Sequence, residues 1–153
     1  MFSLRTTITA LLVLFASSPV VADAVTVNDA WIREAPPVSK VQAAYATFKN
    51  SQPGDIEIIS ASSPAFNKIE FHETIKEGGL MKMRQQTSIK VTAKETTELK
   101  PEGMHLMLFN PVKRLIAGDN ISIEFKLSDG RKFTSSFVVK KASGSDHHHH
   151  MHH

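Results

Sequence analysis

The residues best suited to bind a metal are concentrated in two short segments and at the end of the chain. After the initiator, the methionines are Met81, Met83, Met104, Met107 and Met151. Only two histidines, His72 and His105, precede residue 147. Methionines that merely fill gaps in a hydrophobic core are normally scattered along a chain. The clustering therefore favours a site in which thioether sulfur and imidazole nitrogen are ligands.

This ligand set selects a particular ion. Thioether sulfur is soft and uncharged, so it binds Cu(I) well and binds Zn(II), Mg(II) or Ca(II) poorly. Two imidazoles and two thioethers would form a neutral, four-coordinate site suited to a monovalent ion. Thioether ligands also persist in an oxidising compartment without forming disulfides, although they can be oxidised to sulfoxide.

The first His and Met are predicted to meet across a β-hairpin. His72 precedes the glycine pair 78–79 and Met83 follows it. We expect Ile75 to pair with Leu80 around a four-residue loop, which places His72 directly opposite Met83. Directly opposed residues have Cβ atoms about 4.5–5.5 Å apart, so both side chains could reach one ion.

The second His and Met lie two residues apart on another predicted strand. His105 and Met107 therefore point to the same face of that strand. The site is then expected to comprise His72, Met83, His105 and Met107. Taken singly, each of these residues could be an ordinary sheet or core residue, and we expect Met104 to be one. Met81 shares the strand face of Met83, so it is a rim residue or an auxiliary ligand.

The elements that must position these residues read as strands. Short β-type stretches occupy residues 25–33, 43–50, 56–61, 69–75, 80–85, 89–93, 105–109, 121–127 and 132–140. Asp129-Gly130 between the last two is a strong hairpin signal. No segment has sustained helical periodicity, and many short, regularly spaced strands indicate an antiparallel β-sandwich or barrel.

Composition excludes several classes of function. The 153 residues, 41% of them hydrophobic, suggest a single globular domain. The net charge of +3 is spread thinly, so there is no nucleic-acid footprint. The absence of cysteine excludes blue-copper, Cys-zinc and thiol-based active sites. No carboxylate pair, Ser/His/Asp set or phosphate loop is evident, and we expect a binding protein that is not an enzyme.

Three segments are expected along the chain. Residues 1–24 resemble a signal peptide, with Arg5, a short apolar run and Ala22-Asp23-Ala24 as a cleavage pattern after Ala24 or Ala22. An uncleaved anchor is the alternative. Residues 25–141 would form an exported, monomeric domain without a membrane span. With no cysteine in the chain, a lipobox is not expected.

Residues 142–153 are expected to form a flexible tail rich in imidazole and thioether. Its ligand-type residues are His147, His148, His149, His150, Met151, His152 and His153. The tail could be a purification tag, but Met151 interrupts the histidines and favours a natural feature. A natural tail would bind Cu(II), or Cu(I) with the help of Met151, and could raise the local copper concentration.

The spacing of the four candidate ligands resembles a known family signature. In the periplasmic copper chaperones often called PCuA(C), a His, ten residues, a Met and twenty-one residues precede His-x-Met. Here His72, Met83, His105 and Met107 follow that spacing at every position. The resemblance extends over residues 25–140 and includes Phe71-His72-Glu73-Thr74 and Gly103-Met104-His105-Leu106-Met107-Leu108.

The resemblance implies more than the residues alone establish. It implies a cupredoxin-like Greek-key β-sandwich with an exposed Cu(I) site in the periplasm. It also implies delivery to the dinuclear copper centre of cytochrome c oxidase, alongside Sco-type proteins. The alternatives are a copper buffer without a dedicated acceptor, a structural β-sandwich and a copper redox enzyme.

Overall fold

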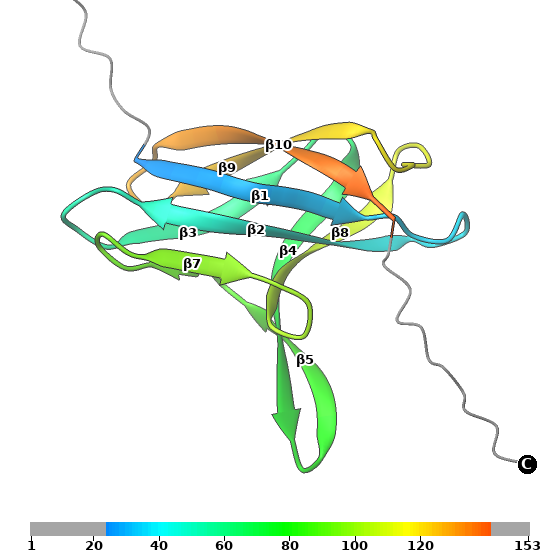
Figure 1. The fold of residues 1–153 in the computed structure, drawn as a ribbon, viewed down its shortest axis with the longest axis horizontal. Helices are drawn as coiled ribbons and strands as arrows, with labels where there is room; N and C mark the ends of the chain where they lie inside the picture. The colour runs from blue at the N-terminus through cyan, green and yellow to red at the C-terminus, as the bar shows by residue number, and fades with distance from the viewer. Residues whose placement is uncertain (1–23, 142–153) are drawn as a thin grey trace, which may run out of the picture.

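The computed structural model describes residues 24–141, which form ten strands and no helix (Figure 1). The strands are β1 (Val25–Arg33), β2 (Val41–Asn50), β3 (Ile56–Ser62), β4 (Phe66–Glu77), β5 (Leu80–Gln86), β6 (Ile89–Val91), β7 (Thr96–Leu99), β8 (Met104–Pro111), β9 (Asn120–Leu127) and β10 (Lys132–Lys140). No helix within these residues is long and apolar enough to cross a membrane. The all-β prediction is confirmed.

The strands form one continuous hydrogen-bonded sheet. Its order is β5-β4-β8-β2-β1-β10-β9-β3-β6, and β7 pairs with β2 beyond the end of the β2–β8 ladder. All pairs are antiparallel except β1 with β10, which is parallel. The predicted antiparallel sandwich therefore contains one parallel pair, where the first and last strands of the domain lie side by side.

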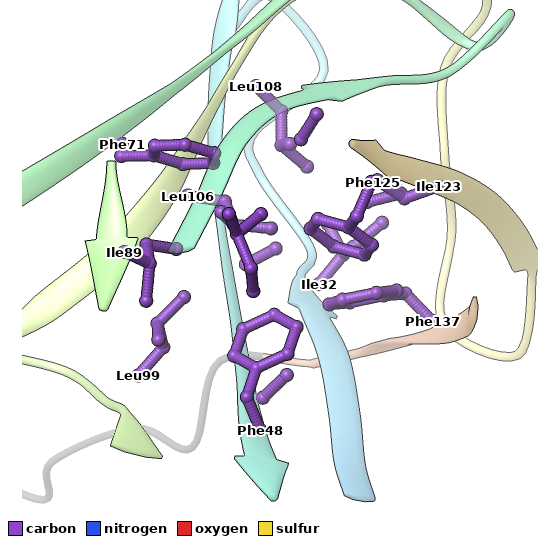
Figure 2. Packing of buried hydrophobic residues seen from close by; sticks show 14 of the residues in the cluster. Ile32, Phe48, Phe71, Ile89, Leu99, Leu106, Leu108, Ile123, Phe125 and Phe137 are labelled. Atoms are coloured by element: carbon purple, nitrogen blue, oxygen red, sulfur yellow. The ribbon is translucent and has the colours of Figure 1, made fainter. Parts of the chain in front are cut away.

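The sheet folds over on itself and encloses one core. Phe48 on β2 packs edge-on against Phe125 on β9, with ring centroids 5.3 Å apart, although three strand boundaries separate the two in the sheet. Figure 2 shows both rings among buried side chains from the two layers, including Phe137 and Ile123. Strand β9 illustrates the cause, because its alternate residues are buried and the residues between them face outward.

The same alternation positions the site on β4 and β8. Phe71, Leu106 and Leu108 point into the core from these two strands, as Figure 2 shows. Residues one position away from them in sequence must then point to the opposite face. His72 and His105 are two of these residues, so burial of the apolar face fixes the face that presents the imidazoles.

A tight turn connects β4 to β5. Gly78 and Gly79 have φ angles of 59° and 80°, the left-handed region required by a two-residue hairpin turn. Glu77 pairs with Leu80 across it, so the loop has two residues and the prediction of a four-residue loop was wrong. The hairpin projects from the body of the sandwich (Figure 1).

Candidate metal site

Two imidazoles face one another on neighbouring strands. His72 on β4 pairs directly with His105 on β8, and their ring centroids lie 6.1 Å apart with the planes tilted by 37°. Sequence reasoning placed these residues on separate strands without indicating that the strands are neighbours. The pairing of β4 with β8 brings both imidazoles into reach of a common ion.

The two methionines lie on the same face as the histidines, and each is diagonal to His72. Met107 pairs with Glu70, two positions from His72 along β4. Met83 on β5 pairs with Thr74, again two positions from His72. Diagonal neighbours are about 7–8 Å apart, a separation that long side chains can bridge. Methionine has three rotatable side-chain bonds, so its sulfur can move toward the imidazoles.

The hairpin register differs from the prediction. His72 pairs with Gln85 and not with Met83, because the two-residue turn shifts β5 by two positions relative to the expected pairing. A shift of two residues preserves the face of every side chain, whereas a shift of one would have reversed it. The direct opposition of His72 and Met83 was wrong, but both residues still share a face.

The four side chains lie at very different depths. His105 is only 5% exposed, and the His72 side chain is 15% exposed. Met107 is half-buried and Met83 is 63% exposed. The expectation that all the ligands lie at the surface was wrong for the imidazoles. An ion could therefore enter past an exposed thioether and reach nitrogens that are shielded from water.

Each imidazole has one nitrogen engaged and one available. His105 Nδ1 lies 2.9 Å from the carbonyl oxygen of Gly103. When Nδ1–H donates to this oxygen, Nε2 carries a lone pair that is available to a metal ion. His72 Nε2 lies 2.9 Å from Glu70 Oε2, whereas His72 Nδ1 is buried and has no hydrogen-bond partner among the described residues. A buried nitrogen without a partner is unfavourable, and a metal ion would satisfy it.

Glu70 is the residue that sequence reasoning missed. Its carboxylate contacts His72 on one oxygen and Lys68 Nζ, at 2.7 Å, on the other. The Lys68 ammonium, followed by the His72 imidazole, holds the Glu70 pKa below its ordinary value. Two-residue alternation along β4 is the sequence signal that could have indicated Glu70, because it places Glu70 on the face of His72. Glu73, next to His72 in sequence, faces away and accepts a hydrogen bond from Gln86.

Aromatic rings surround the imidazole pair. Phe109 lies 6.5 Å from His72, and Tyr45 lies 6.4 Å from His105, measured between ring centroids. Trp31 packs beyond Tyr45, with ring centroids 4.7 Å apart and the planes tilted by 39°, and the Arg33 guanidinium lies over both of these rings. Burial raises the pKa of Tyr45 above its ordinary value, partly opposed by the charge of Arg33. The rings limit the access of water to His105.

The other two methionines of the domain, Met81 and Met104, differ in their burial. Met81 pairs with Lys76, lies nearer the hairpin tip on the face of Met83 and is 55% exposed, so it stands at the rim. Met104 packs against the core, as expected.

The tail ligands of residues 147–153 and the cleavage pattern at residues 22–23 lie outside the described residues. Within residues 24–141, no three His, Asp or Glu side chains gather as a metal site.

Known proteins resemble this chain in sequence. The LpqE-like family model, described as "Putative lipoprotein LpqE-like", matches residues 25–139. The "Putative lipoprotein Lxx21020" of Leifsonia xyli subsp. xyli (strain CTCB07) is 33% identical over 126 residues, which are 82% of this chain and 75% of that protein. A lipoprotein family indicates an exported protein.

Solved structures share the fold. Cu(I)-bound DR1885 from Deinococcus radiodurans superposes with a TM-score of 0.65 at 26% identity, over 80% of this chain and 81% of that one. The copper-bound PCuAC domain from PmoF2 gives a TM-score of 0.66 at 16% identity, over 78% and 94% of the two chains. The chain therefore belongs to the LpqE-like family and has the cupredoxin-like fold of the PCuAC domains.

Proposed function

We propose that this protein is a periplasmic Cu(I) metallochaperone that binds one ion through His72, Met83, His105 and Met107. The observation that carries the proposal is the common face of these four residues, where each imidazole keeps one nitrogen available. The DR1885 structure, named as a Cu(I) form, supports the choice of ion. Copper is the cargo, and the protein performs no chemical conversion on it.

The depth of the ligands suits transfer. A partner can compete for the exposed Met83 first, and the ion then remains on the two shielded imidazoles until further ligands from the partner replace them. We propose that the acceptor is the dinuclear copper centre of cytochrome c oxidase or a Sco-type protein. The buried imidazoles also suit retention, so a periplasmic copper buffer without a dedicated acceptor is the second candidate.

A Cu(I) titration tests the binding site. The protein ending at residue 141 is titrated against a chromophoric Cu(I) chelator, and X-ray absorption then identifies the scatterers. We expect one bound ion with nitrogen and sulfur neighbours. If this truncated protein did not bind Cu(I), only the tail could bind copper, and the assignment of the four ligands would be refuted.

A transfer experiment separates the chaperone from the buffer. The Cu(I)-loaded protein is mixed either with the purified copper domain of an acceptor or with a chelator of equal affinity. A chaperone should load the acceptor faster than the chelator, because contact between the proteins allows ligand-by-ligand exchange. Equal rates would favour the buffer. N-terminal sequencing of the mature protein from a periplasmic fraction tests export.

A further inference from the structure

A hollow at the end of β8 has features of a binding site. It has a volume of about 190 Å³ and lies between the loop that leads into β2 and the segment that begins at the last residue of β8. The residues that matter here are Val38, Lys40, Gln42, Val112, Lys113 and Arg114. None of them belongs to the candidate metal site.

Gln42 lines this hollow with an unsatisfied amide. Its side chain is only 6% exposed, and Oε1 is buried without a hydrogen-bond donor among residues 24–141. An unpaired buried amide oxygen costs about 1–3 kcal/mol. Gln42 pairs with Leu108 in the β2–β8 ladder, so its backbone is fixed and the amide cannot readily leave.

The charged side chains that line the hollow are all positive. Lys40, Lys113 and Arg114 are exposed, and no acidic residue lines the hollow. None of the three forms an ion pair within the part of the chain that the structure describes. A ligand that bears carboxylates would complement this charge.

Apolar surface adjoins the charges. Val38 is 86% exposed and Val112 is 72% exposed, although both are large hydrophobic residues. Val112 and Lys113 also line a second, mostly apolar hollow together with Pro64 and Ala65. The recognition surface therefore continues across Val112. A free inorganic anion would use none of this apolar area.

We propose that this hollow docks an extended acidic segment of the protein that receives the copper. Acidic side chains of the segment pair with the three cations, and an apolar side chain covers Val38 and Val112. The proposal rests on the proposed function for the identity of the partner. Strand β8 links the two places, since Pro111 at the hollow is four residue steps, about 13 Å, beyond Met107.

The test is an NMR titration of the copper-free, full-length protein with a terminally blocked peptide, Glu-Val-Asp-Val-Glu. The matched peptide Gln-Val-Asn-Val-Gln keeps the backbone and the valines but removes the charges. We expect the acidic peptide to shift the side-chain amide of Gln42 and the backbone amides of Val112 and Lys113. The uncharged peptide should bind at least about tenfold more weakly.

Variants assign the effect to the hollow. The double variant K113E/R114E should weaken binding of the acidic peptide by about tenfold or more, whereas K126E, on an exposed lysine of β9, should leave it unchanged. Val112→Ser should weaken binding of both peptides, because it removes an apolar contact that does not depend on charge. Val112 is exposed, so this variant should fold like the wild type.

Several results would overturn the proposal. These are no shift at the named amides, equal binding of the two peptides, equal effects of K113E/R114E and K126E, or the same shifts with acetate or inorganic phosphate at peptide concentrations. Cu(I) titration of K113E/R114E separates this proposal from the previous one, and wild-type affinity is expected. If the wild-type protein failed to bind Cu(I), the proposed function would fall while the peptide result stood.

Discussion

At the scale of single residues, the candidate site combines on one face of the sheet a residue that supports folding and a residue that serves mainly in binding. The buried His105 is held by the Gly103 carbonyl, and the exposed Met83 is held by little besides its own strand. A buried residue contributes to folding as well as to binding, whereas an exposed one contributes mainly to binding. Substitutions at the two positions should therefore have separable consequences.

Met83→Ala should lower the Cu(I) affinity sharply and leave the melting temperature unchanged, because its side chain is 63% exposed. His105→Ala should lower both the affinity and the stability, the latter by about 1–3 kcal/mol, since it empties a buried position. Competition titration and thermal unfolding measure the two effects. Met81→Ala is the matched control on the same hairpin face, and it should change neither quantity much. Unaltered affinity in both ligand variants would refute the assignment.

Glu70 should act on copper through His72. Glu70→Ala should lower the Cu(I) affinity by about tenfold or more, because outer partners orient a ligating imidazole. Glu70→Gln should retain most of the affinity, since its amide oxygen can still accept from His72 Nε2. Competition titration of both variants tests this, with NMR of the His72 ring nitrogens as a direct readout. A Glu70→Ala protein with wild-type affinity would show that the contact has no positioning role.

At the scale of elements, the β4–β5 hairpin determines where Met83 lies. Its turn depends on two glycines in the left-handed region, where a residue with a side chain is strained. The tip is exposed and contributes nothing to the core cluster. Strain at the turn should therefore affect the position of β5 more than the stability of the domain.

Gly79→Val should strain the turn by about 1–2 kcal/mol. We expect faster amide hydrogen exchange along β5 and weaker Cu(I) binding, with little change in global unfolding. Gly54→Ala provides the control, because Gly54 has no positive φ and an added Cβ there would meet nothing within 4 Å. If β5 exchanged as slowly in Gly79→Val as in the wild type, the turn would not control the hairpin.

Much of this element-scale picture was predictable from local signals. Alternation in the sequence correctly placed His105 and Met107 on one face, and it placed His72 with Met83 despite the wrong register. The predicted register of the β4–β5 hairpin was wrong because it assumed a four-residue loop, although a Gly-Gly pair is itself a signal for a two-residue turn. The pairing of His72 with His105 depends on contact between strands far apart in sequence. Local periodicity contains no information about such a contact.

At the scale of the whole molecule, the core and the site occupy different parts of one sheet. Phe125 lies among Phe48, Phe133 and Phe137, with ring centroids 5.1–6.1 Å away. The parallel pairing of β1 with β10, which the sequence did not indicate, places Phe125 of β9 and Phe133 of β10 against Phe48 of β2. Without cysteine in the chain, this packing must supply the stability that disulfides give other exported domains.

Phe125→Ala should therefore destabilise the domain by about 3–5 kcal/mol, as expected for a large buried aromatic side chain. The Cu(I) affinity of the molecules that remain folded should be unchanged, because Phe125 does not contact the imidazole pair. Chemical denaturation and a Cu(I) titration at low temperature measure the two quantities. A coupled loss of affinity would mean that the core sets the geometry of the site.

The row of rings beside the site has an optical consequence. Trp31 is the only tryptophan in the chain, and its ring packs against Tyr45, which also lies next to His105. Loading of an ion on His105 would alter the surroundings of this pair and change the emission intensity of Trp31. The protein would thus carry an intrinsic fluorescent reporter of its own occupancy, and copper gain and loss could be followed in real time without a label. Emission that does not respond to Cu(I) would show that the rings are insulated from the site.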